Sequence, residues 1–274
     1  MKVKLILGSV VILLSAASFV QAQENELHGK VGVIWDSKYI WRGFDVFPDK
    51  SAIHPFIDLD LYGTGFGVNI MAHRANSSGF ENSERWDYNL YYQNLIYEGE
   101  PYQTNYRLGY VYYNYPDNSS HTTSSIDLQE IHTILSWPNI LPVEGLVPTY
   151  VLVKLWPTNS GSPVGAGSPF GGTASGWAHI FMLDYGFTVP GLLPDTPEQV
   201  MNLHTEMVYN DGVHPGGGNA DQDWSNIVFG LSTNFDLTEN LTFTPGVYHQ
   251  ITMDNSVNPD DDETWVSLNL AYKF

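Results

Sequence analysis

The sequence predicts an all-β fold, a single antiparallel transmembrane β-barrel of about twelve strands with its N- and C-termini in the periplasm. Three observations predict it. Apolar and polar residues alternate through a series of segments, and the connections between these segments are short and long in turn. No apolar segment after Val20 is long enough for a membrane helix. A membrane protein without such a helix crosses the bilayer as a closed barrel.

The first residues have the parts of a secretory signal peptide. Lysines precede an apolar stretch, residues 5–20, and Ala22 ends a small-residue cleavage motif. The stretch is short for a transmembrane helix, and an acidic, polar segment follows it in place of a basic stop-transfer cluster. We therefore expect a signal peptide at residues 1–22 and an outer-membrane β-barrel at residues 23–274.

Composition narrows the classes of protein. The chain has no cysteine, which excludes disulfides, thiol nucleophiles and cysteine metal ligands. Its formal net charge of −19 argues against nucleic acid as a partner. The 25 glycines, 16 prolines and 14% aromatic residues suit many strands joined by turns.

Each predicted strand places apolar residues on one face and polar residues on the other, because strand side chains alternate. We expect the apolar face to meet lipid and the polar face to line the lumen. The first strand, residues 28–41, places Val31, Val33, Trp35, Tyr39 and Trp41 outward. The seventh, residues 147–156, places Val147, Val151, Val153 and Leu155 outward and Tyr150 and Lys154 inward. Outward residues in the other ten are Ile57 in 53–62, Ile70 in 66–73, Tyr88 in 85–93, Leu108 in 102–112, Ile131 in 126–137, Phe181 in 177–189, Leu203 in 202–210, Phe229 in 226–235, Val247 in 241–251 and Leu268 in 265–274.

The connections give a second, independent signal. Those after even-numbered strands are tight or rich in proline: 63–65, 97–101, 138–145, 190–198 and 236–240. Those after odd-numbered strands are longer and polar: 75–84, 115–124, 157–176, 211–223 and 253–263. Outer-membrane barrels have short periplasmic turns and long outer loops, so this asymmetry places both termini in the periplasm.

A soluble secreted β-sandwich or barrel would also have short alternating strands, with the apolar face turned inward. Periodicity alone does not separate the two folds. The asymmetry of the connections, the density of tyrosine and tryptophan near strand ends, and the aromatic Phe274 favour the membrane barrel.

Two segments resemble known proteins. The alternation of Val266, Leu268, Leu270, Tyr272 and Phe274 resembles the closing strand of Gram-negative outer-membrane barrels. This resemblance implies that Leu270, Tyr272 and Phe274 form a signal for the barrel-assembly machinery.

The segment Ser37–Gly43, Ser-Lys-Tyr-Ile-Trp-Arg-Gly, resembles the Ser-Lys-Tyr-x-x-Arg-Gly signature of the TorF family of porin-like proteins. Residues 209–212 and 241–248 are similar to segments of the same family. The resemblance implies a pore in the outer membrane and names no solute.

Twelve strands predict a narrow lumen whose properties depend on individual side chains. The residues expected to line it are Asp36, Lys38, Arg42, Asp58, Asp60, Arg107, Glu130, Lys154 and Glu206. The four cations are expected to form a basic strip, opposed by Asp58, Asp60, Glu130 and Glu206. Such charges either set ion selectivity or form salt bridges that stiffen the wall, and both interpretations stay open.

Arg42 and Gly43 lie where the first strand meets an outer loop. Glycine permits a bulge or a folded-in loop there. A constriction near the mouth is one interpretation, and a structural corner is the one that we prefer.

The sequence predicts no catalytic residues, no metal site and no cofactor. It has no nucleophile motif beside a histidine, no repeated ligand spacing and no phosphate-binding loop. We therefore expect a protein that is not an enzyme.

Two functions remain open. One is a porin for passive diffusion of small solutes or ions across the bacterial outer membrane. The other is a non-conducting surface or structural protein whose acidic outer loops bind a partner or assemble into a complex. Expected partners are outer-membrane lipid, the barrel-assembly machinery, and other copies of the chain or other envelope proteins.

Overall fold

The computed structural model describes residues 26–117, 127–158, 176–193, 196–211, 222–258 and 261–274. The predicted signal peptide, and most of the connection expected at 157–176, lie outside these ranges. Within the described part of the chain, no helix is long and apolar enough to cross a membrane.

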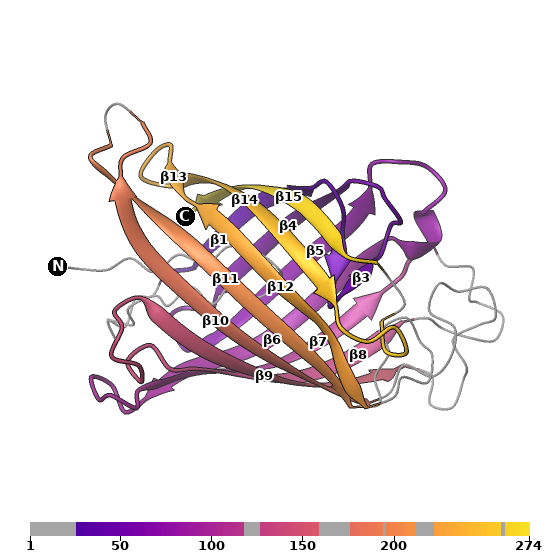
Figure 1. Ribbon diagram of the computed structural model, residues 1–274, viewed down its shortest axis with the longest axis horizontal. Coiled ribbons are helices and arrows are strands. Elements are labelled where there is room, and N and C mark those ends of the chain that lie inside the picture. Colours follow the sequence, from indigo (N-terminus) through magenta and orange to yellow (C-terminus); the bar gives the residue numbers. More distant parts are fainter. Residues whose placement is uncertain (1–25, 118–126, 159–175, 194–195, 212–221, 259–260) are drawn as a thin grey trace.

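Twelve long antiparallel strands form the wall of a closed barrel, as predicted (Figure 1). They are β1 (His28–Asp36), β4 (Ala52–Asp60), β5 (Phe66–Ala75), β6 (Arg85–Ile96), β7 (Thr104–Asn114), β8 (Leu128–Ser136), β9 (Leu146–Pro157), β10 (Gly176–Pro190), β11 (Glu198–Asp211), β12 (Asp223–Thr233), β14 (Leu241–Thr252) and β15 (Glu263–Lys273). Shorter elements are β2 (Ile40–Trp41), β3 (Phe44–Asp45), β13 (Phe235–Asp236) and the 3-10 turn η1 (Glu81–Ser83).

Pairing between β1 and β15 closes the barrel. Val31 lies opposite Tyr272 in the register of this pair, and the Gly29 amide donates to the Phe274 carbonyl at 3.0 Å. Strand β1 therefore begins, and strand β15 ends, at the same rim, which we call the termini rim. The opposite rim is called the loop rim. That the termini rim faces the periplasm stays a prediction.

The connections at the two rims differ in length, as the sequence predicts. At the termini rim, the gaps between successive wall strands are residues 61–65, 97–103, 137–145, 191–197 and 234–240. At the loop rim the gaps are 37–51, 76–84, 115–127, 158–175, 212–222 and 253–262.

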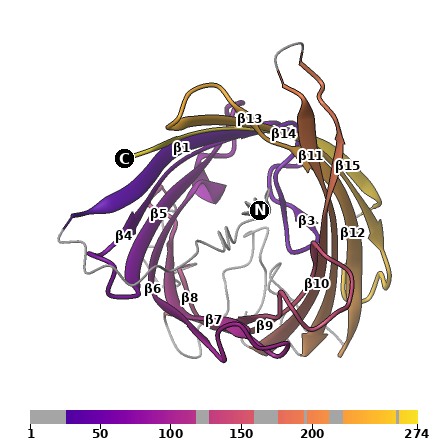
Figure 2. The ribbon, with the colours of Figure 1, turned by 90° about the vertical axis from the view of Figure 1, so that its left-hand side faces the viewer.

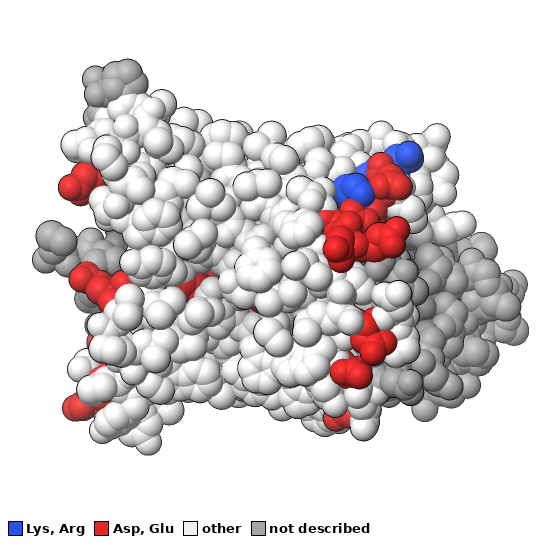
Figure 3. Space-filling model, viewed as in Figure 1, with Lys and Arg blue, Asp and Glu red and all other residues white. Residues whose placement is uncertain are grey.

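The outer face of the wall is apolar. Leu90 and Ile131 are each 53% exposed, and Phe181 is 45% exposed, although all three lie within long strands. On the face in Figure 3, acidic side chains gather towards both ends and basic side chains at one end, and the middle of the wall is almost free of charge. An exposed apolar belt of this kind suits the hydrocarbon core of a bilayer.

The first strand is shorter than predicted. β1 ends at Asp36, and the chain then turns into the barrel, where β3 lies inside the ring of strands (Figure 2). Arg42 has φ 51° and Gly43 has φ 97°, and two positive values in succession form the tight turn that joins β2 to β3. Tyr39 and Trp41 are therefore buried inside the barrel at 2% and 3% exposure. The prediction that they face lipid is wrong.

Strand β9 faces the opposite way from the prediction. Val151, Val153 and Leu155 are fully buried on the lumenal side, whereas Tyr150 and Lys154 lie on the outer face. Both faces of this strand are largely apolar, so alternation gave a weak signal and Lys154 alone decided it. The inward set packs in the apolar cluster that also contains the residues folded into the barrel.

A charge in the apolar belt should destabilise the barrel. Leu90 lies mid-strand in β6, beside outward-facing Val68 and Tyr110. We expect Leu90→Arg to lower the free energy of unfolding by about 2–4 kcal/mol, because the guanidinium would sit in hydrocarbon. Urea unfolding in lipid vesicles measures this change. The control is Leu237→Arg, which is equally exposed but lies in a turn at the termini rim. Equal unfolding midpoints for the two variants would contradict the membrane assignment.

Candidate functional site

We call residues 39–47 the lumenal hairpin. Its turn is hydrogen-bonded to β14 and to the loop that follows it, and packs closely against β12. The Gly43 carbonyl accepts hydrogen bonds from Gln250 Nε2 at 2.7 Å and from Asn258 Nδ2 at 2.9 Å. A Cβ on Gly43 would lie 2.6 Å from Asn226 Oδ1. Both this close approach and the positive φ of Gly43 require glycine.

Tyr39, at the start of the lumenal hairpin, packs against the opposite part of the wall. Its ring centroid lies 4.7 Å from that of His54 on β4 and 4.8 Å from that of His73 on β5. Arg85 Nη2, from β6, donates to the Tyr39 hydroxyl at 2.8 Å. The hairpin is therefore held on two well-separated parts of the barrel.

An ion pair joins the turn of the lumenal hairpin to β8. Arg42 Nη2 donates to Glu130 Oε2 at 2.6 Å, and the two side chains are only 9% and 2% exposed. Glu130 also accepts from the Tyr113 hydroxyl at 2.7 Å and lies 3.1 Å from His132 Nδ1. Several donors on one carboxylate offset the cost of burying its charge.

The indole of Trp41 contacts two guanidinium groups. Its ring centroid is 4.2 Å from Arg85 Cζ and 5.1 Å from Arg42 Cζ, and Tyr113 meets it edge-on at 5.6 Å. Arg85 also pairs with Asp87 through two hydrogen bonds of 2.6 and 3.0 Å. Cation–π contact and ion pairing thus fix both cations beside the hairpin.

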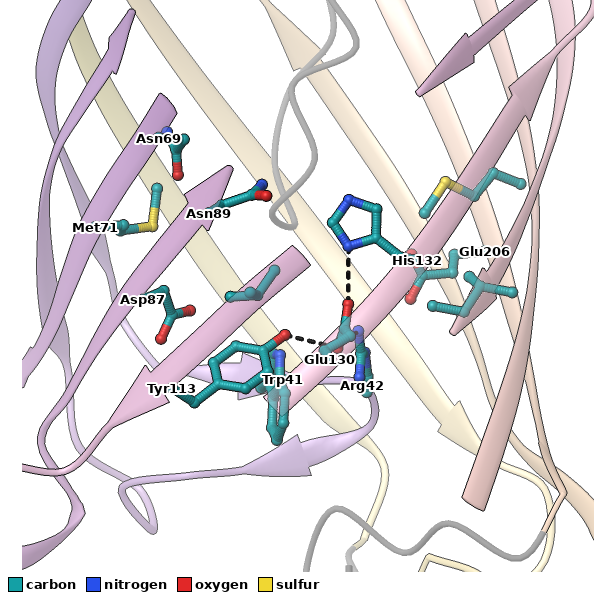
Figure 4. A pocket seen from close by; sticks show the side chains of 13 residues that line it. Trp41, Arg42, Asn69, Met71, Asp87, Asn89, Tyr113, Glu130, His132 and Glu206 are labelled. Atoms are coloured by element: carbon teal, nitrogen blue, oxygen red, sulfur yellow. Dashed lines mark hydrogen bonds and ion pairs between the residues drawn. The ribbon is translucent and has the colours of Figure 1, made fainter. Parts of the chain in front are cut away.

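A small cavity remains beside the lumenal hairpin (Figure 4). Its volume is about 60 Å³, enough for a few water molecules. The residues that line it are Trp41, Arg42, Asn69, Met71, Asp87, Asn89, Val111, Tyr113, Glu130, His132, Ile180, Met182 and Glu206. In Figure 4, Glu206 and His132 lie on one side of the cavity, and Asn69 and Met71 lie on the other.

Two buried histidines link β1, β4, β5 and β6 under Tyr39. Asp36 Oδ2 lies 3.2 Å from His54 Nε2, and the Nδ1 atoms of His54 and His73 are 2.9 Å apart. His73 Nε2 lies 3.0 Å from Asp87 Oδ2. If His73 Nε2 donates to Asp87, its Nδ1 accepts from His54 Nδ1.

Lys38 lies at the mouth of the barrel on the loop rim. Its ammonium donates to Asp49 at 2.7 Å and to Glu263 at 2.6 Å. These two hydrogen bonds raise the pKa of Lys38. The hydrogen bond between Lys38 and Asp49 also lowers the pKa of Asp49. Lys38 therefore ties the hairpin's entry to β15 rather than lining a passage.

Arg107 and Asp58 face the lumen nearer the termini rim. The Tyr91 hydroxyl donates to Asp58 at 2.7 Å, and Arg107 Cζ lies 4.0 Å from the centroid of the Tyr91 ring. Arg107 Nε also donates to Gln93 at 3.1 Å. Asp60 ends β4 and accepts from the Gly63 amide at 2.9 Å, so it belongs to the turn at the rim.

The predicted basic strip does not form. Lys154 lies on the outer face, with its ammonium 5.3 Å from the centroid of the Trp177 ring, so the prediction that it lines the lumen is wrong. Arg42 is paired directly with Glu130. The sequence predicts these two residues on opposing basic and acidic strips. Beside the hairpin, the two guanidinium groups of Arg42 and Arg85 are paired with Glu130 and Asp87.

Sequence reasoning missed Tyr39 and Trp41 as lumenal residues. The available signal was the Arg42–Gly43 pair, because a glycine after a polar residue is typical of a tight hairpin turn. The structure shows that this corner is a tight turn between β2 and β3 that is folded into the barrel (Figure 2). That it forms a constriction stays a prediction.

The described residues contain no group of three or more histidines and carboxylates that could hold a metal ion. The polar groups of the site are arranged as ion pairs and hydrogen bonds among protein side chains. This geometry can narrow a passage and present charge to a solute.

Comparison with known proteins gives a fold. No protein-family profile matches the chain, and no curated protein matches it either. Among solved structures, the NanC porin is similar over 91% of this chain and 100% of its own, at 10% sequence identity and a TM-score of 0.51. The KdgM porin in complex with disordered oligogalacturonate covers 90% and 99% at 10% identity, with a TM-score of 0.46. OprD from Pseudomonas aeruginosa covers 92% and 66% at 11% identity, with a TM-score of 0.42.

The wall, with its exposed apolar belt, defines a class by fold: a closed, twelve-stranded transmembrane β-barrel. Within that class, the NanC porin shares the overall fold of this chain.

The ion pair of Arg42 and Glu130 should be strongly coupled. We expect Arg42→Ala to lower the free energy of unfolding by about 3–5 kcal/mol, because it leaves the Glu130 carboxylate buried without its cation. The double variant Arg42→Met with Glu130→Leu should recover most of that loss. Urea unfolding of Arg42→Met, of Glu130→Leu and of the double variant gives the coupling energy. Purely additive losses would show that the pair does not hold the hairpin.

Proposed function

We propose that this chain is a porin-like channel for passive diffusion of small solutes or ions across the outer membrane of a Gram-negative bacterium. The observation that carries the proposal is a hairpin folded into the lumen of a closed barrel, with a cavity beside it. The hairpin narrows the lumen, and the cavity lining combines apolar side chains with charged and amide side chains that can contact a hydrated solute.

Membership of the TorF family is part of this proposal. The residues that carry the resemblance, Ser37–Gly43, are those that leave the wall and enter the lumen. Lys38, Tyr39 and Arg42 each make a contact that holds this segment in place. A signature made of such residues supports a shared constriction.

The proposed topology places the termini rim in the periplasm and the long connections outside, after removal of a signal peptide. Leu270, Tyr272 and Phe274 lie on the outer face at the termini rim, each at least 39% exposed. Their exposure supports a role as an assembly signal. The proposed partners are outer-membrane lipid, the barrel-assembly machinery and other envelope proteins or copies of the chain.

We propose no enzymatic activity. The buried histidines pair with carboxylates or with each other, as parts of the wall.

Conductance tests the proposed channel. The purified full chain in planar bilayers should give discrete current steps in potassium chloride. Absence of steps above background in several salts would favour the alternative, a non-conducting surface protein.

Removing the indole of Trp41 should widen the passage. We expect Trp41→Ala to raise single-channel conductance, because the side chain occupies the lumen beside the cavity. The matched control is Trp86→Ala on the outer face of β6, where Trp86 is 41% exposed. A conductance that is the same in both variants would refute the lumenal hairpin as the constriction.

A further inference from the structure

The charges around the cavity pair off, with one exception. Arg42 lies at 2.6 Å from Glu130, and Arg85 lies at 2.6 Å from Asp87. Each pair is close to neutral when seen from the cavity. Glu206 also lines the cavity, and among the described residues it has no cation within ion-pair distance.

The fold presents Glu206 to the lumen from the middle of β11. In the register of the sheet it lies between Met182 on β10 and Val228 on β12, neither of which can neutralise it. The residue is 5% exposed, so its carboxylate is largely shielded from bulk water. A charge held in such surroundings acts on nearby ions more strongly than a charge on the outer surface does.

A second carboxylate, Asp184, lies close to Glu206 on the same side of the lumen. Asp184 on β10 pairs with His204 Nδ1 at 2.7 Å, two residues before Glu206 on the same face of β11. This pair is neutral when His204 is protonated and negative when it is not. The wall on this side of the cavity therefore carries at least one uncompensated negative charge when Glu206 is ionised.

We propose that Glu206 is the residue that determines charge specificity in this channel, and that the favoured solutes are small cations, including molecules that bear an ammonium group. The inference rests on the proposed function. A carboxylate beside a narrow passage stabilises a passing cation and repels an anion. Trp41 and Arg42 of the hairpin line the same cavity as Glu206, so a solute that passes the hairpin through this cavity comes close to the Glu206 carboxylate.

Carboxylates at the loop rim offer a competing source of cation preference. Asp261 and Asp262 lie in the last loop, outside the narrow part of the lumen. Their influence is screened by salt over about 10 Å at 0.1 M, whereas a shielded charge at the constriction is screened less. High salt therefore separates the two sources.

Reversal potentials across a potassium chloride gradient test the proposal, first at low and then at high salt. The wild-type channel should prefer cations, and Glu206→Gln should lower the permeability ratio of cation to anion about threefold or more at both salt concentrations. The matched control, Glu239→Gln, removes an exposed carboxylate from the turn before β14 and should leave the ratio unchanged. Methylammonium chloride serves as the probe for ammonium-bearing solutes and should show the same dependence on Glu206.

Two further variants keep the test decisive if Glu206→Gln fails to fold. Glu206→Asp keeps the charge and should keep the cation preference. Val228→Lys places an ammonium opposite Glu206 in the register of β11 and β12, and should abolish the preference with Glu206 intact.

The outcomes are distinct. A wild-type channel that prefers anions, or a Glu206→Gln channel with the wild-type ratio, overturns the assignment of Glu206 while the channel itself stands. A wild-type protein without conductance overturns the proposed function instead.

Discussion

The ion pair between Arg42 and Glu130 is the interaction on which the interior of this barrel depends. A guanidinium at the tip of a two-strand hairpin stays inside a barrel only if its charge is balanced there, because burying it alone would cost several kcal/mol. Glu130 supplies that balance, and Tyr113 fixes the carboxylate with a further hydrogen bond. The pair therefore selects the inserted position of the hairpin over a position in solvent at the loop rim.

The inserted hairpin explains why part of the lumenal wall is apolar. A water-filled lumen would favour polar side chains, yet Ile134, Val151 and Val153 are fully buried on the inner face of this barrel. They cluster with Tyr39 and Trp41 of the hairpin, so the apolar part of the wall is the surface against which the hairpin packs. The charged residues Arg42, Asp87, Glu130 and Glu206 line the cavity that remains beside it.

The sequence predicts the wall well and the interior poorly, for physical reasons. Lipid requires apolar side chains on the outer face of each strand, so the alternation of polarity correctly predicts the outward face of eleven of the twelve strands. The lengths of the connections predict the rim at which each one lies. Strand β9 is the exception, because its lumenal face packs against the hairpin and is therefore as apolar as its lipid-facing side. Tyr39 and Trp41 mislead in the same way, since an aromatic residue suits either environment. Glu206 was predicted on the correct face, but its lack of a partner follows only from the pairing of Arg42 with Glu130.

Stability and selectivity are consequently linked through a single cation. Among the described residues, Arg42 provides the only guanidinium or ammonium group that lines the cavity, and it is paired with Glu130. If Arg42 were free to move towards Glu206, the hairpin would lose its anchor on β8 while the constriction lost its net negative charge. Evolution of such a channel towards anionic solutes would therefore require a new cation near β11 rather than a shift of Arg42. The apolar positions flanking Glu206, at Met182 and Val228, are where the fold would accept one.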